Sequence, residues 1–188
     1  MRITILPNSQ KVRTAKYVLL NGGVITYPTE GVFGLGCIAD DYVAVNRILK
    51  IKNRKLTKGL IIIISDVNQI KNWIDINIEN NDLHSSNENP ITWILPANND
   101  APHWIKGNHS SIAVRKTTHP IARKLCISTN SALISTSANI ANRPPARNVF
   151  ILHRLFSNLV DYMVPGNCGT KNRPSEIRNL VTGDILRQ

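Results

Sequence analysis

The sequence predicts an α/β domain in which helices pack on a mixed β-sheet. Two observations support this fold class. Short apolar runs rich in β-branched residues alternate along the chain with segments whose apolar residues recur at helical spacing. The core they would form is aliphatic, because 42% of the residues are hydrophobic and only 5% are aromatic. The chain has 188 residues, the size of one domain, so we expect residues 1–188 to fold as a single unit.

The first predicted elements are a strand and a helix. Val24–Tyr27 follows the turn residues 21–23 and predicts a strand. Either Asp40 or Asp41 is placed to cap a helix over residues 43–51, where apolar residues lie near helical spacing.

The middle of the chain predicts three strands and a short helix. Residues 60–64 are apolar throughout, which is typical of a strand covered on both faces. A short helix is expected after Asp66, and strands are expected over 91–95, where Pro96 ends the run, and over 112–115.

The last third continues the alternation. His119 and Pro120 open a predicted helix that continues to residue 126, because proline is favoured in the first helical turn. Residues 132–134 predict a strand that enters a turn at 135–139, and 149–159 predict a helix. Three final strands are expected over 160–164, 177–181 and 184–186.

The charge of the chain favours an anionic partner. The formal net charge is +11, and six basic residues and no acid lie between Arg47 and Lys58. Such a cluster suits a nucleotide phosphate or an RNA backbone. A solvated basic surface accounts for the charge equally well, so charge alone leaves nucleic-acid binding open.

Several other classes of site are disfavoured. The three cysteines form no CxxC pair and the five histidines show no metal-binding spacing, so no zinc or redox site is expected. Ser137 is outside a GxSxG motif, which argues against a serine hydrolase. The apolar run at residues 1–8 is too short for a signal peptide, and no run reaches the roughly 20 residues of a membrane span, so a cytoplasmic protein is expected.

Three local patterns leave alternatives open. Gly31, Gly34 and Gly36 do not have Walker A or Rossmann spacing, and a simple turn is favoured over a ligand-binding loop. Lys52 and Arg54 are two residues apart, so they face one ligand only if the helix ends near residue 51. A basic helix end that complements the macrodipole explains them as well. Glu30 is expected to be structural.

The order of several short motifs resembles the YrdC/Sua5 family, the threonylcarbamoyl-AMP synthases. The resemblance covers nearly the whole chain and is closest to the bacterial single-domain form. Each motif is weak alone, but their order is specific. They are Tyr27-Pro28-Thr29-Glu30 with Val32-Phe33-Gly34-Leu35-Gly36, Lys52-x-Arg54, Lys58-Gly59-Leu60-Ile61, Ala113-Val114-Arg115, Ser135-Thr136-Ser137-Ala138-Asn139, Pro174-Ser175-Glu176-Ile177-Arg178 and Leu186-Arg187.

The resemblance implies a fold and a reaction. The fold is an open, twisted α/β sheet with a large basic cleft. The reaction joins L-threonine, bicarbonate and ATP into threonylcarbamoyl-adenylate and pyrophosphate, with Mg²⁺ carried by ATP. The adenylate serves N6-threonylcarbamoyladenosine formation at position 37 of tRNA, through other proteins that perform the transfer, and direct contact with tRNA is a further expectation.

The resemblance also assigns residues to this reaction. Lys52, Arg54, Ser137 and Asn139 would form the catalytic and ATP-binding group, which Arg147 and Arg187 extend on the nucleotide side. Thr29, Arg115, Thr136 and Ser175 would surround threonine, with Arg115 on its carboxylate. Three positions depart from the family pattern, namely Gly31, Phe33 and Glu176. The alternative function is an RNA-binding or ribosome-maturation factor that uses the same basic surface without catalysis.

Overall fold

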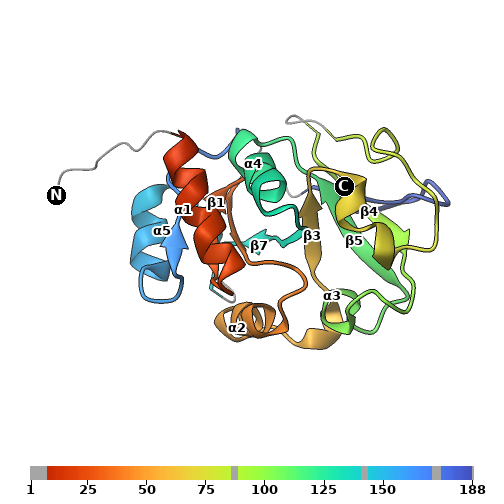
Figure 1. Ribbon diagram of the computed structural model, residues 1–188, viewed down its shortest axis with the longest axis horizontal. Helices are drawn as coiled ribbons and strands as arrows, with labels where there is room; N and C mark the ends of the chain where they lie inside the picture. Colours follow the sequence, from red (N-terminus) through yellow and green to blue (C-terminus); the bar gives the residue numbers. More distant parts are fainter. Residues whose placement is uncertain (1–7, 86–88, 141–143, 171–174, 188) are drawn as a thin grey trace.

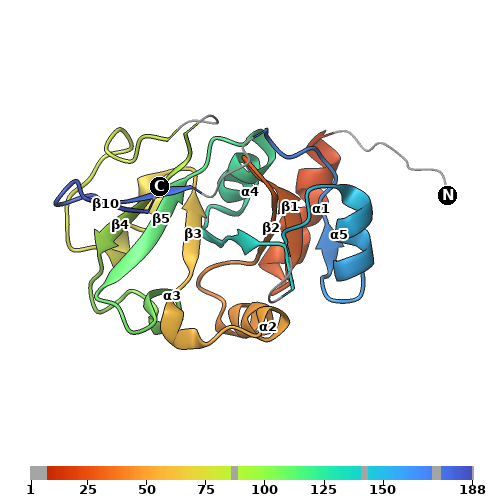
Figure 2. The same ribbon diagram turned by 180° about the vertical axis from the view of Figure 1, so that it is seen from behind.

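Two mixed β-sheets and the helices around them make up the fold (Figures 1 and 2). The computed structural model describes residues 8–85, 89–140, 144–170 and 175–187. The four-stranded sheet has the order β7-β2-β1-β8. Its strands are β1 (Ile25–Pro28), β2 (Phe33–Gly36), β7 (Thr136–Ser137) and β8 (Tyr162–Met163).

The second sheet has six strands in the order β10-β9-β4-β5-β3-β6. Its strands are β3 (Ile61–Ile64), β4 (Ile91–Pro96), β5 (Ser111–Lys116), β6 (Leu133–Ile134), β9 (Glu176–Asn179) and β10 (Ile185–Arg187). The helices are α1 (Asn8–Leu20), α2 (Tyr42–Lys52), α3 (His103–Lys106), α4 (Pro120–Thr129) and α5 (Val149–Phe156), and three single 3₁₀ turns are η1 (Leu56–Lys58), η2 (Val67–Gln69) and η3 (Lys71–Trp73).

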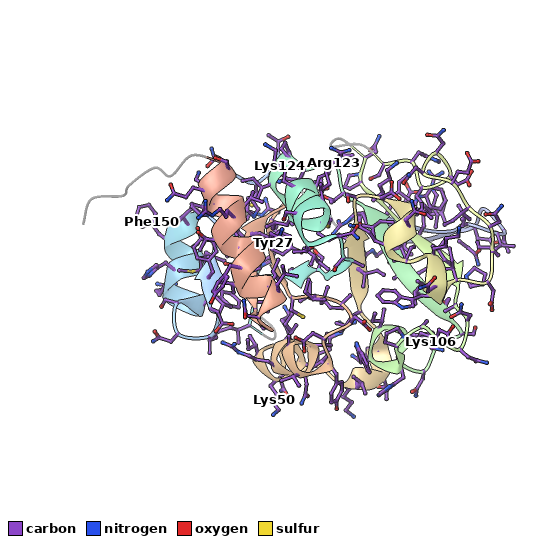
Figure 3. All side chains as sticks on the ribbon, in the orientation of Figure 1. Tyr27, Lys50, Lys106, Arg123, Lys124 and Phe150 are labelled. Carbon is purple, nitrogen blue, oxygen red and sulfur yellow. The ribbon has the colours of Figure 1, made fainter. Side chains whose placement is uncertain are left out.

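Two apolar clusters hold these layers together. The smaller cluster lies beneath α1 and α4, which run side by side in Figure 1, and it contains the fully buried Tyr27 labelled in Figure 3. The larger cluster gathers α2, α5 and the opposite side of β3. Ile63 belongs to the smaller cluster, whereas Ile62 and Ile64 belong to the larger one. Since neighbouring strand residues point to opposite faces, β3 is covered on both sides, as its sequence predicted.

Most predicted elements are present. Asp41, and not Asp40, caps α2 by accepting the N–H of Ala44 at 3.0 Å. The helix expected after His119 is α4, with Pro120 at its start. The short helix expected after Asp66 forms as two 3₁₀ turns, η2 and η3.

Four expectations need correction. The elements form two sheets where one was expected. The glycine-rich stretch expected as a turn contains strand β2, and the turn expected at 135–139 contains β7, which pairs with β2. Helix α1 was not expected, because its apolar residues Val12, Ala15 and Leu19 form only a narrow buried stripe. Residues 1–7, Pro174 and Gln188, which belong to the N-terminal run, the Pro174–Arg178 motif and the expected 1–188 domain, lie outside the described residues.

Candidate active site

A cavity of about 700 Å³ lies between the two sheets. The four-stranded sheet and its loops contribute Thr29, Phe33 and Ser137, and the six-stranded sheet contributes Ile61, Ala113 and Arg115. The cavity is large enough for a drug-sized or nucleotide-sized ligand. Eight of the ten residues that the resemblance assigns to substrates line it: Thr29, Arg54, Arg115, Thr136, Ser137, Arg147, Ser175 and Arg187. Lys52 and Asn139 are not among the lining residues.

The end of α2 separates Lys52 from Arg54. Lys52 is the last residue of the helix, and Asn53 follows in the left-handed conformation, with φ 45° and ψ 48°. Its N–H donates to the carbonyls of Leu49 and Lys50, which closes the helix. This ending meets the condition under which Lys52 and Arg54 can serve one site, because Arg54 no longer follows the helical path.

Lys52 connects α2 to the segment after β7. Its Nζ donates to the carbonyl of Ser137 at 2.8 Å, to the carbonyl of Asn139 at 2.7 Å, and to Asn139 Oδ1. The Ser137 hydroxyl also donates to Asn139 Oδ1, at 2.7 Å. Although Lys52 and Asn139 are 87 residues apart, one ammonium group therefore gathers the polar residues of both motifs.

Burial lowers the pKa of Lys52, and the nearby charge of Arg54 lowers it further, to about 8. A lysine with such a pKa exchanges its proton close to neutral pH. Phosphate oxygens at this position would favour the ammonium form again.

Arg54 is fixed by the loop that follows it. Its Nη2 donates to the carbonyl of Gly59 at 2.9 Å. Gly59 is packed against a second loop, because a Cβ at this residue would lie 2.8 Å from the carbonyl oxygen of Lys106. Gly107 is tighter still: a Cβ there would lie 2.4 Å from Thr57 O and 2.5 Å from Gly59 N. Two glycines thus let these loops interlock and form one wall of the cavity.

The residues assigned to threonine come from both sheets and their loops. Arg115 is in β5, opposite Ile63 of β3, and its side chain makes no hydrogen bond or ion pair with the described residues. Thr29 donates its hydroxyl to the carbonyl of Val32 at 2.6 Å. Ser175 shares a hydrogen bond of 2.8 Å with the buried hydroxyl of Thr92, and its carbonyl accepts from Arg187 Nη2, also at 2.8 Å.

Glu30 is almost fully buried and lines the cavity. Its Oε1 accepts from the Thr117 hydroxyl at 2.7 Å and from the N–H groups of Thr118 and His119 at 3.1 and 3.3 Å. Burial alone would raise the pKa of Glu30, but Arg115, the Thr117 hydroxyl and the neighbouring N–H groups outweigh it. The pKa therefore lies below its usual value and the carboxylate is ionised at neutral pH.

Sequence reasoning did not single out Lys106 and His109, which also line the cavity. They lie in and after the one-turn helix α3, where no element was expected. The only local signal was Gly107, and its importance depends on a distant loop. Lys58 also lines the cavity, from the basic cluster recognised in the sequence.

Metal-ligand clusters and membrane-spanning helices are two further features that the described residues could contain. Within the described ranges, no three His, Cys, Asp or Glu residues gather as metal ligands. Among these same residues, no helix is both long enough and apolar enough to cross a membrane.

Known proteins resemble this chain over nearly its full length. Residues 17–188 match the Sua5/YciO/YrdC family model, whose description is telomere recombination. The chain is 44% identical to the threonylcarbamoyl-AMP synthase of Nitrosococcus oceani, over 94% of this chain and 97% of that protein. It is 43% identical to the threonylcarbamoyl-AMP synthase of Coxiella burnetii, over 95% of this chain and 97% of that protein.

Solved structures share the fold. P. abyssi Sua5 complexed with L-threonine superimposes with a TM-score of 0.81 at 28% identity, over 95% of this chain and 52% of that one. E. coli YciO superimposes with a TM-score of 0.79 at 22% identity, over 97% of this chain and 91% of that one, and supports the fold alone. By its sequence over almost the whole length, and by its fold, the chain belongs to the Sua5/YciO/YrdC family.

Proposed function

We propose that this protein is a threonylcarbamoyl-AMP synthase, which makes threonylcarbamoyl-adenylate and pyrophosphate from L-threonine, bicarbonate and ATP. The relatives that carry this name are more than 40% identical over nearly the whole chain. The observation that carries the proposal is the single cavity lined by residues of both expected groups, Arg54 and Ser137 for ATP and Arg115 and Ser175 for threonine.

The basic residues and the uncharged polar residues have different roles in this reaction. Forming a carbamate and adenylating it brings the ATP phosphates, bicarbonate and a carboxylate together, and these anions repel one another. Lys52 and Arg54 neutralise the phosphates and the charge that develops on them, and fixed donors cost no reorganisation during the reaction. Ser137 and Asn139 orient the nucleotide, and Arg147 and Arg187 extend the site on that side. Catalysis rests on positioning, without a covalent enzyme intermediate.

The threonine end uses hydroxyls and a guanidinium. Arg115 binds the threonine carboxylate through a bidentate pair. Thr29, Thr136 and Ser175 surround the rest of the amino acid. Glu30 is the one acidic residue in the described part of the lining, so Mg²⁺ enters with the ATP phosphates and not on a set of protein carboxylates.

The product serves tRNA. We place residues 1–188 in the cytoplasm as one YrdC-like domain, whose adenylate passes to the proteins that modify adenosine 37 of tRNA. Direct contact with tRNA is compatible with the net charge of +11.

Pyrophosphate release tests the proposal. Purified protein with Mg²⁺ should release pyrophosphate only when ATP, L-threonine and bicarbonate are all present. Lys52→Ala and Arg54→Ala should each abolish release. Lys50→Ala is the matched control, because Lys50 is on the same helix but exposed, away from the cavity, and is labelled in Figure 3. Full activity in both site variants would contradict the assignment.

The second candidate is an RNA-binding factor without catalysis, favoured by the net charge of +11. It requires RNA binding that weakens steeply with salt, and no turnover of ATP. Absence of RNA binding at physiological salt would exclude it.

A further inference from the structure

Glu30 differs in the sign of its charge from the other charged residues described in the cavity lining. Of the described residues that line the cavity, six are lysines or arginines and one, Glu30, is acidic; the basic residues are Arg54, Lys58, Lys106, Arg115, Arg147 and Arg187. ATP, bicarbonate and the threonine carboxylate are all anions, and a carboxylate in the wall repels each of them. Among threonine, bicarbonate and ATP, the α-ammonium of threonine is the one substrate group that carries positive charge at neutral pH.

The structure holds Glu30 ionised and in one place. Three donors from the segment after β5 fix Oε1, as described above. The backbone is fixed from the other side, because a Cβ at Gly169 would lie 2.3 Å from the carbonyl oxygen of Glu30. A side chain held this firmly is suited to present its remaining oxygen in a constant direction.

That remaining oxygen has no partner. Oε2 of Glu30 is buried and accepts no hydrogen bond from the described residues, and Nε of Arg115 is buried and donates none. The two side chains interact electrostatically but form no ion pair in the described part of the chain. Buried polar atoms are nearly always hydrogen-bonded, so an unpaired acceptor beside an unpaired donor indicates a missing group that satisfies both. An α-amino acid has such a group, because its ammonium and carboxylate are attached to one carbon.

We propose that Glu30 and Arg115 together recognise the α-amino acid zwitterion, with Glu30 Oε2 accepting from the amino group and Arg115 donating to the carboxylate. The inference rests on the proposed function and adds a specificity residue to it. An amino acid gains one charge-assisted hydrogen bond at each end, whereas an acid with no donor on its α-carbon leaves the Glu30 carboxylate unpaired.

A comparison of two ligands tests this role. Isothermal titration calorimetry would measure binding of L-threonine and of 3-hydroxybutanoate, which is the threonine skeleton without its amino group. The unmodified protein should prefer threonine. Glu30→Gln should weaken threonine binding about tenfold, in the middle of the range for coupled neighbouring groups, and leave 3-hydroxybutanoate binding unchanged or tighter. Glu79→Gln, at an exposed glutamate, is the matched control and should change neither ligand.

Each outcome separates the alternatives. If Glu30→Gln weakened both ligands equally, Glu30 would act only by shaping the site, and the proposal would be overturned. If Glu30→Gln failed to fold, Glu30→Asp would test the proposal in its place, because it keeps the charge but shortens the side chain. A smaller preference for threonine in Glu30→Asp supports the proposal, and an unchanged preference overturns it. Unmodified protein that binds no threonine would contradict the proposed function itself, which is a different result from threonine binding that ignores Glu30.

Discussion

Gly107→Ala should destabilise the protein strongly, because this residue lets two loops of the cavity wall meet. Gly107 has φ 62° and ψ −134°, a conformation outside the regions that L residues favour, which costs an L residue about 1–3 kcal/mol. Its Cβ would also lie within 2.7 Å of three backbone atoms, Thr57 O, Gly59 N and Thr57 C. Backbone atoms cannot turn aside as a side chain can, and forced overpacking of this kind costs about 1–3 kcal/mol more.

Gly183→Ala is the matched control. Gly183 has φ 77° but nothing lies within 4 Å of the position of its Cβ, so it carries the conformational cost alone. We expect a loss of about 2–6 kcal/mol in the free energy of unfolding for Gly107→Ala and about 1–2 kcal/mol for Gly183→Ala. With a urea dependence of about 2 kcal/mol per molar, the unfolding midpoints should fall by about 1–3 M and 0.5–1 M.

Urea unfolding followed by circular dichroism measures both midpoints. Pyrophosphate release shows whether the cavity wall keeps its active arrangement. Gly107→Ala should also lower the rate of pyrophosphate release at urea concentrations where the variant is still folded, since Lys58 and Lys106 lie beside the shifted loops. Equal midpoints for the two variants would refute the reasoning, because steric contact is the main difference invoked between them.

Three further predictions concern the helices. Burial, and then the charge of Arg54, lower the pKa of Lys52 to about 8, and ATP phosphates should raise it, so ATP binding should take up protons near pH 8 and weaken as the pH rises through this range. Lys52→Arg should remove this pH dependence of ATP affinity in calorimetry. An unchanged pH dependence in the variant would contradict the role of Lys52. Asn53→Gly should change stability little, whereas Asn53→Val, with a β-branched residue at φ 45°, should cost about 1–2 kcal/mol in thermal unfolding; equal stability would contradict the left-handed helix end. Phe156→Ala should cost about 3–5 kcal/mol because the ring is fully buried, and Phe150→Ala on the same helix should cost little because the ring, labelled in Figure 3, is 83% exposed; similar losses would argue against this packing of α5.

Local signals in the sequence predicted the elements that local forces decide. The aspartate cap of α2, the buried run of β3 and the proline at the start of α4 each depend on a few neighbouring residues. Strands β2 and β7 escaped prediction because each contains short, weakly strand-forming residues and is defined by its partner. Gly34 pairs with Ser137 across more than a hundred residues, and no local pattern contains that information.

The features of the site also separate into those that local sequence patterns predicted and those that depend on the folded structure. The spacing of Lys52 and Arg54 indicated that they can face one ligand only if the helix ends near residue 51, and α2 does end at Lys52. Glu30 was expected to be structural, and its three hydrogen bonds fit that role, but the unpaired Oε2 is a property of the folded surroundings alone. Lys106 and His109 reach the cavity only because two glycines pack against each other.

The order of the chain has a consequence for synthesis. Every buried member of the two apolar clusters lies at or before Val164, whereas Ser175, Ile177, Leu186 and Arg187 complete the cavity wall from beyond that point. A chain emerging from the ribosome at about 5–20 residues per second therefore presents the buried residues of these clusters before the last residues of its binding site. Substrates cannot act as a template for the early steps of folding, so the core of the nascent protein has to be stable without them.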